Sequence, residues 1–140
     1  MRKRRNPAIA IQRGAILLGA GLLVCACSGG ESVANLGSAR WGDIDVAVES
    51  RPWPPHAGNN EVVVIVSGAH HKPVYDALVQ LRTLSATGAA SEWVQAIQDG
   101  HVGVYRRAVA FAPTPQQTLQ VQLHRGQSQG LVEFSVALTP

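Results

Sequence analysis

The chain has 140 residues and a formal net charge of +3, from 12 basic and 9 acidic side chains. Five of the basic residues precede Cys27, so the chain from Cys27 onward has seven basic against nine acidic side chains, a net charge of −2. This balance excludes the clustered Lys and Arg that nucleic-acid phosphates require. The 114 residues from Cys27 onward are enough for a single domain.

The N-terminal segment has the pattern of a secretory signal peptide. Residues 1–13 contain five basic side chains and no acidic one, and residues 14–26 carry no charge at all. Thirteen apolar residues are too few for a permanent membrane span, which needs about 20. We therefore expect residues 1–26 to direct export and then to be removed, with the basic flank held in the cytoplasm.

The end of the apolar run, Val24-Cys25-Ala26-Cys27, resembles the lipobox of bacterial lipoproteins. The aliphatic Val24 and the small Ala26 then occupy positions −3 and −1, which makes Cys27 the lipidated residue. The resemblance implies an anchor of several acyl chains, enough for stable membrane attachment. Because Ser28 rather than Asp follows, it also favours the outer membrane over the inner one. A metal or disulfide role for Cys25 and Cys27 is disfavoured, because both lie within this membrane-inserting segment.

Residues 27–42 are rich in Gly, Ser and Ala, and we expect them to form a lipidated N-terminus and a flexible tether. The domain is then expected to span residues 43–140. Apolar residues alternate with polar ones over residues 43–49, which predicts a half-buried strand. The β-branched run at residues 61–67 predicts a strand buried on both faces. Further strands are predicted at residues 74–84, 93–98, 101–111, 118–125 and 131–138.

Turn signals separate these predicted strands. Asp99-Gly100 is a hairpin signal, and the residues from Gly126 to Gly130 form a second turn region. Three prolines in residues 51–60 exclude that stretch from a central strand. The pattern predicts an all-β fold, an immunoglobulin-like antiparallel β-sandwich of about seven strands. No cysteine pair spans its sheets, so only the architecture is that of an immunoglobulin domain.

Several segments, taken in order, resemble the YtkA-like family, which is related to the FixH domain. They are Pro54-Pro55 with Gly58-Asn59, then His71-Lys72-Pro73-Val74 in place of the family's GxPV, then residues 100–106 in place of its GxGxYxA strand. The resemblance covers roughly residues 43–138 and implies an exported, membrane-attached domain, in some members encoded near copper or respiratory-oxidase genes. Residues 85–91 replace the family's Met-Pro-rich segment and residues 115–117 its Gly-x-Trp, so a copper role carries over poorly.

Five histidines are candidate metal ligands, because neutral imidazole binds Cu(II), Zn and Ni. His70 and His71 are adjacent in a predicted turn and can meet His56 or His101 at one end of the sandwich, with Asp76 as a possible oxygen ligand. Adjacent residues on a strand point to opposite faces, so this pair chelates only if the turn twists. The alternative is that these histidines bind no metal and are simply exposed to solvent in loops.

No catalytic residue is predicted, because the sequence has neither a Gly-x-Ser-x-Gly motif nor a phosphate-binding glycine loop. We expect the chain not to be an enzyme. Trp53, set among prolines, either covers the end of the sandwich or forms a partner-binding surface. Trp93 is expected in the core, and Tyr105 is expected to be buried with a hydrogen-bond partner.

Two functions follow from these observations. The first is a non-catalytic binding or accessory module of an envelope complex, attached to the membrane through Cys27 and contacting an unidentified envelope protein. The alternative is periplasmic binding or delivery of copper or zinc through His56, His70, His71 and His101. The first needs no cofactor, whereas the second predicts a Cu or Zn site.

Overall fold

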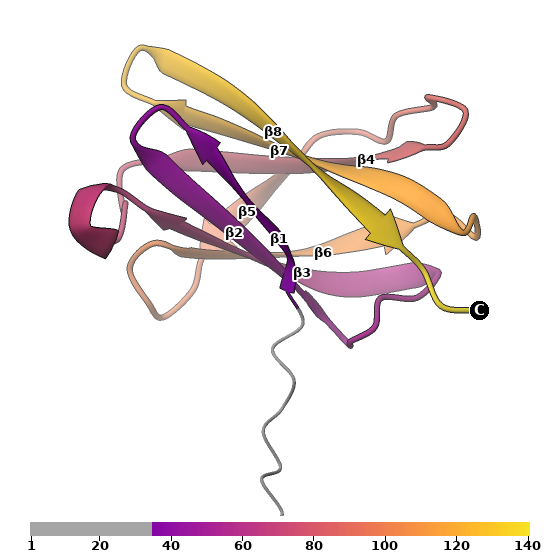
Figure 1. Cartoon of the computed structure of the whole chain (residues 1–140). Helices are drawn as coiled ribbons and strands as arrows, with labels where there is room; N and C mark the ends of the chain where they lie inside the picture. The colour runs from indigo at the N-terminus through magenta and orange to yellow at the C-terminus, as the bar shows by residue number, and fades with distance from the viewer. Residues whose placement is uncertain (1–34) are drawn as a thin grey trace, which may run out of the picture.

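The computed structural model describes residues 35–140, and its elements are eight β-strands and one short 3-10 turn, η1 (Ala69–His71). The fold is an all-β antiparallel sandwich, as the sequence predicts (Figure 1). The predicted signal peptide, Cys25 and Cys27 lie outside the described residues. The strands are β1 (Asn35–Trp41), β2 (Ile44–Arg51), β3 (Gly58–Ser67), β4 (Leu78–Ser85), β5 (Val94–Gln98), β6 (Val104–Phe111), β7 (Gln116–Arg125) and β8 (Ser128–Ala137).

The extra strand is β1, which forms inside the segment that the sequence analysis assigns to a flexible tether. It pairs antiparallel with β2, from Asn35 opposite Glu49 to Trp41 opposite Ile44. Leu36, Ala39 and Trp41 are half-buried against the core. The tether prediction is therefore wrong for residues 35–41. Their Gly, Ser and Ala content conceals these apolar contacts, and the folded domain includes them.

The eight strands form one continuous antiparallel sheet in the order β1-β2-β3-β6-β5-β4-β7-β8. The sheet folds over at β5, which pairs with β4 on one side and with β6 on the other. One layer is thus β1-β2-β3-β6 and the other is β4-β7-β8. At the far edges β1 approaches β8, where the ring of Trp41 lies against Gly130. The sandwich is therefore nearly closed into a barrel.

The core lies between the two layers and confirms the predicted alternation. Ile44, Val46 and Val48 of β2 are all buried, with the intervening residues less so. In β3, Val62, Val64 and Val66 face the core, whereas Glu61, Ile65 and Ser67 on the other face are half-buried. Only Val63 is buried on that outer face, so the predicted burial of this strand on both faces is wrong for most of its length. The closing hairpin supplies Leu119, Val121 and Leu123 from β7, and Val132, Phe134 and Val136 from β8.

Two predictions differ from the structure. The strand predicted to start at Val74 starts at Leu78, because the chain from Gly68 onward forms η1 and an irregular connection. Trp93 does not lie in the core but is half-buried on the surface, where the guanidinium carbon of Arg82 stands 4.4 Å from its ring centroid. A cation over an aromatic face is a favourable arrangement that needs no burial of the ring.

Within residues 35–140 no helix is long and apolar enough to span a membrane.

The connections between strands lie at two opposite ends of the sandwich, because neighbouring strands are antiparallel. The turn at residues 42–43, the connection at 68–77, and the turns at 99–103 and 126–127 form what we call the histidine end. The loops at residues 52–57, 86–93 and 112–115 and the segment 138–140 form what we call the proline end. The two ends lie toward opposite sides of Figure 1. The ten residues of β3 separate them by roughly 30 Å.

Candidate metal-binding site

The four predicted histidine ligands divide between the two ends. His70 and His71 form η1, and His101 lies in the turn between β5 and β6, so these three are at the histidine end. His56 lies at the proline end, where it forms an isolated bridge with Thr139. The structure therefore does not bring the four together, because the whole of β3 separates His56 from the others.

The η1 turn gives His70 and His71 an unusual backbone. Gly68 N–H donates to Lys72 O at 2.8 Å, and Lys72 N–H donates to Ala69 O at 3.3 Å. Both histidines have positive φ, 57° and 56°, a region that few residues other than glycine adopt. Helical turns rotate successive side chains by about 100°, compared with 180° along a strand. The two imidazoles therefore diverge less than strand geometry would impose, and both residues are exposed.

His101 is placed beside this turn by a close contact between two connections. Val66 N–H donates to Gly103 O at 2.8 Å, which ties the β5–β6 turn to the end of β3. A Cβ atom on Gly103 would lie 2.8 Å from both Pro73 Cβ and Val66 O, so only glycine permits this approach. His101 N–H donates to Asp99 O at 2.8 Å within the turn. The His101 turn thus packs directly against the segment that follows His71.

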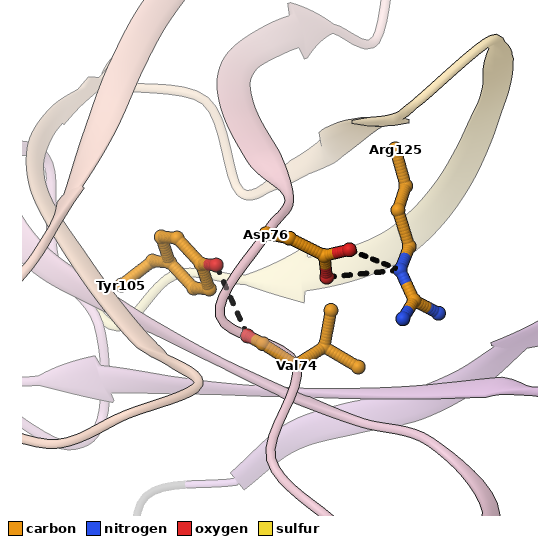
Figure 2. Close-up of polar contacts among 4 residues, drawn as sticks. All are labelled: Val74, Asp76, Tyr105 and Arg125. Carbon is orange, nitrogen blue, oxygen red and sulfur yellow. Dashed lines mark hydrogen bonds and ion pairs between the residues drawn. The ribbon is translucent and has the colours of Figure 1, made fainter.

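A phenol and an ion pair hold the connection after η1 in place (Figure 2). Tyr105, on β6, is 3% exposed and donates its hydroxyl to Val74 O at 3.1 Å, as predicted. Arg125 Nε lies 2.9 and 3.1 Å from the two carboxylate oxygens of Asp76. Burial raises the pKa of Tyr105, a backbone hydrogen bond at Ala77 lowers it, and the negative charge of Asp76 raises it further. The phenol is therefore neutral at physiological pH.

The donor set fits an open, imidazole-based site and not a closed one. Across residues 35–140, no three His, Cys, Asp or Glu side chains are grouped closely enough to enclose a metal ion. Asp76, the predicted oxygen ligand, is already paired with Arg125. The adjacent His70 and His71 can supply at most two nitrogen ligands, and solvent would fill the remaining positions. Nitrogen ligands of this kind suit Cu(II) and Zn(II).

The proline end is built differently, from buried amide side chains. Asn60 is 1% exposed, accepts from His56 N–H at 3.1 Å, and donates to His56 O at 2.7 Å and to Gly58 O at 3.0 Å. Gln117 holds the β6–β7 loop in the same way, accepting from Ala112 N–H at 3.0 Å and donating to Ala112 O at 2.6 Å. Trp53 keeps 45% of its surface exposed, so it does not serve as a core cap.

The sequence reasoning missed the features that build the histidine end. The left-handed turn of His70 and His71 is framed by Gly68 and Pro73, and this glycine–proline frame is the signal in the sequence. The packing of Gly103 on Pro73 leaves no such signal, because it joins segments 30 residues apart. The distance of His56 from the other three histidines follows from the length of β3, the ten-residue strand that begins two residues after it.

No protein-family model matches this chain, and no curated protein matches it by sequence. The resemblance to the YtkA-like family is therefore not confirmed. Two copper-bound variant proteins have similar structures, FetP of uropathogenic Escherichia coli strain F11 and P19 of Campylobacter jejuni. The FetP variant shares 5% sequence identity with this chain at a TM-score of 0.53. The match covers 76% of this chain and 91% of the FetP chain. The P19 variant shares 8% sequence identity at a TM-score of 0.51, and the match covers 76% of this chain and 98% of the P19 chain.

FetP in its as-isolated form, from the same E. coli strain, is 6% identical, has a TM-score of 0.50, and covers 74% of this chain and 95% of its own. At such low identities these likenesses show a shared β-fold and nothing finer.

Proposed function

We propose that this chain is an exported, non-catalytic protein that binds Cu(II) at its histidine end and passes it to another envelope protein. The observation that carries the proposal is the pair of exposed histidines, His70 and His71, held in a left-handed turn beside the His101 turn. The likeness of the fold to two copper-bound proteins supports copper over other ions. This favours the metal-binding alternative of the sequence analysis over the accessory module.

The oxidation state follows from the ligand types. Cu(I) prefers thiolate and thioether ligands, whereas imidazole suits Cu(II). The only methionine is Met1, and the only cysteines are Cys25 and Cys27, so no sulfur ligand follows residue 27. Lys72, next to His71, adds a positive charge that weakens cation binding. We therefore expect Cu(II) binding of moderate affinity.

An open site suits transfer better than storage. A site with two protein ligands leaves coordination positions for the incoming ligands of a partner, so the ion can leave without the sandwich unfolding. Because only neutral imidazole binds a metal, acidification should also release the ion. The role of this chain's own residues is then to bind, present and release the ion.

The experiment that tests this function is a calorimetric titration with Cu(II), and separately with Zn(II), of the chain from Ser28 to Pro140. We expect one equivalent of Cu(II) to bind, and the double variant His70→Ala/His71→Ala to lose that binding. His56→Ala is the matched control, because it removes an exposed histidine from the opposite end. Equal loss of binding in the His56 variant, or full binding by the double variant, would refute the proposed site.

We also propose that the chain is lipidated at Cys27 and attached to the periplasmic face of the outer membrane. The lipobox-like residues and the following Ser28 support this assignment. Labelled palmitate should enter the wild type and Cys25→Ala but not Cys27→Ala. Density-gradient separation should place the labelled protein with outer-membrane markers. Label that persists in Cys27→Ala would show that another residue is acylated.

A further inference from the structure

We propose that the proline end rests on the surface of the phospholipid bilayer, so that the histidine end points away from the membrane. This inference rests on the proposed acylation of Cys27. It concerns a surface that the metal-binding function does not use. Its occupant is the lipid surface itself, not a protein partner.

The proline end has the surface chemistry that a bilayer interface accepts. Of the four segments of the proline end, residues 52–57, 112–115 and 138–140 contain no Asp, Glu, Lys or Arg, and residues 86–93 contain one, Glu92. Trp53 is 45% exposed there, and tryptophan favours the boundary between lipid headgroups and acyl chains. Beside the 52–57 loop is a largely apolar shallow pocket lined by Ala57, Pro113, Thr114, Pro115, Leu138, Thr139 and Pro140.

The backbone of this end is also prepared for contact with lipid. An unpaired N–H or C=O group is costly away from water. Asn60 pairs with both polar backbone groups of His56, and Gln117 pairs with both of Ala112. Thr139 N–H donates to Pro55 O at 3.1 Å, and prolines have no N–H to satisfy. These loops therefore satisfy several of their backbone polar groups internally.

The position of the anchor brings this end to the membrane. β1 begins at Asn35, which lies opposite Glu49 near the end of β2 and so near the proline end. Cys27 precedes Asn35 by eight residues, which span at most about 28 Å even when fully extended. The acyl chains are thus attached to the same end of the sandwich that carries the apolar surface.

The opposite end would make a poor lipid contact. Its turns carry Asp43, Lys72, Asp76 and Asp99, and moving charged groups toward a low-dielectric phase is costly. An upright domain therefore puts the charged histidine end roughly 30 Å farther from the lipid than the proline end. The candidate metal site then faces the aqueous compartment.

The test uses full-length protein, acylated in cells, purified and reconstituted into phosphatidylcholine vesicles that contain brominated acyl chains, which quench nearby tryptophans. We expect quenching in the wild type and loss of most of it in Trp53→Phe. Trp41→Phe is the matched control and should retain it, because Trp41 is half-buried at the histidine end, against Gly130. Because Glu92 is the only charged side chain in the proline-end loops and phosphatidylcholine has no net charge, the quenching should be insensitive to added salt.

Three outcomes would overturn the inference, and each is distinct. Acylated protein that floats with the vesicles but shows no quenching dependent on Trp53 refutes the orientation and leaves the anchor intact. Protein that incorporates no palmitate refutes both the anchor and the orientation. A blue shift of Trp53 emission that grows with protein density but without bromine quenching shows that a second copy covers the patch. Copper binding is measured separately and is unaffected by any of these results.

Discussion

The two ends of the sandwich are closed by different chemistry, although the same strands lead into both. At the proline end, Asn60 and Gln117 bond to loop backbone atoms and no charged group takes part. At the histidine end, Tyr105 and the Asp76–Arg125 ion pair hold the connection that carries the two left-handed histidines. The amide side chains of the first closure do not titrate, whereas the second includes the Tyr105 phenol, whose pKa is raised by burial.

This difference fits the division of labour proposed above. A neutral, amide-closed end suits a surface that meets lipid, and an exposed, imidazole-bearing end suits exchange of an ion with solvent or with a partner. Four substitutions test the comparison, from the largest expected effect on stability to the smallest.

The largest effect is expected for Gly103→Ala at the histidine end. The new methyl group would lie 2.8 Å from Pro73 Cβ and from Val66 O, at a residue with φ of 79°. We expect the free energy of unfolding to fall by about 2–4 kcal/mol, measured by chemical denaturation. Gly100→Ala is the control in the same turn, because it has a similar φ of 70° but open space around it, and should cost about 1 kcal/mol. Equal losses in the two variants would show that packing against Pro73 is unimportant.

At the proline end the corresponding change is Asn60→Ala. It leaves His56 O and Gly58 O without the amide donor of Asn60, and the expected loss is about 2–3 kcal/mol in the free energy of unfolding. Loosening of the 52–57 loop should also shift the emission of Trp53. The neighbouring exposed Asn59→Ala should stay within about 0.5 kcal/mol of the wild type. A neutral result for Asn60→Ala would contradict the amide closure.

Tyr105→Phe should cost about 1 kcal/mol near neutral pH, through loss of the hydrogen bond to Val74 O. Burial raises the pKa of Tyr105 in the folded protein, so its stabilising contribution is complete below the unfolded value of about 10 and is lost as pH rises through the folded value. The wild type should therefore lose stability above about pH 10 more steeply than the Phe variant. Tyr75→Phe, at a 72% exposed site, should show the wild-type pH profile. Parallel alkaline profiles for the wild type and Tyr105→Phe would contradict this account.

The smallest effect is expected for Asp76→Asn. The ion pair with Arg125 has side chains 48% and 39% exposed, so solvent and salt screen it strongly. We expect a loss of about 0.5 kcal/mol or less, and no difference from the wild type in 1 M salt. Arg40→Gln, which breaks the exposed pair with Asp45, provides a comparison of the same kind. A loss several times larger for Asp76→Asn would mean that the pair organises the histidine end.

Alternation of apolar residues was sufficient to predict most of the fold. Val46 and Val48, or Leu119 and Val121, are separated by one residue and point to one face, and this period is independent of distant parts of the chain. Alternation failed at β1, where Leu36 and Ala39 are three residues apart and the register shifts between Asn35 and Gly37. It also failed for Trp93, because a cation from β4 gave its ring an alternative to burial.

The candidate site was predictable in its ligand types and only partly in its assembly. Adjacent histidines between a glycine and a proline are visible in the sequence, and they lie in one exposed turn. The packing of the His101 turn against the segment after His71 depends on Gly103 and Pro73, and the exclusion of His56 depends on how far β3 extends. These are properties of strand register, which a single sequence does not encode locally.

Pulsed electron paramagnetic resonance of the chain from Ser28 to Pro140, loaded with one equivalent of Cu(II), tests the central claim most directly. We predict nitrogen couplings typical of imidazole in the wild type and in His56→Ala, and their loss in His70→Ala/His71→Ala. Imidazole couplings that persist in the double variant but vanish in His56→Ala would place the ion at the proline end and contradict the account.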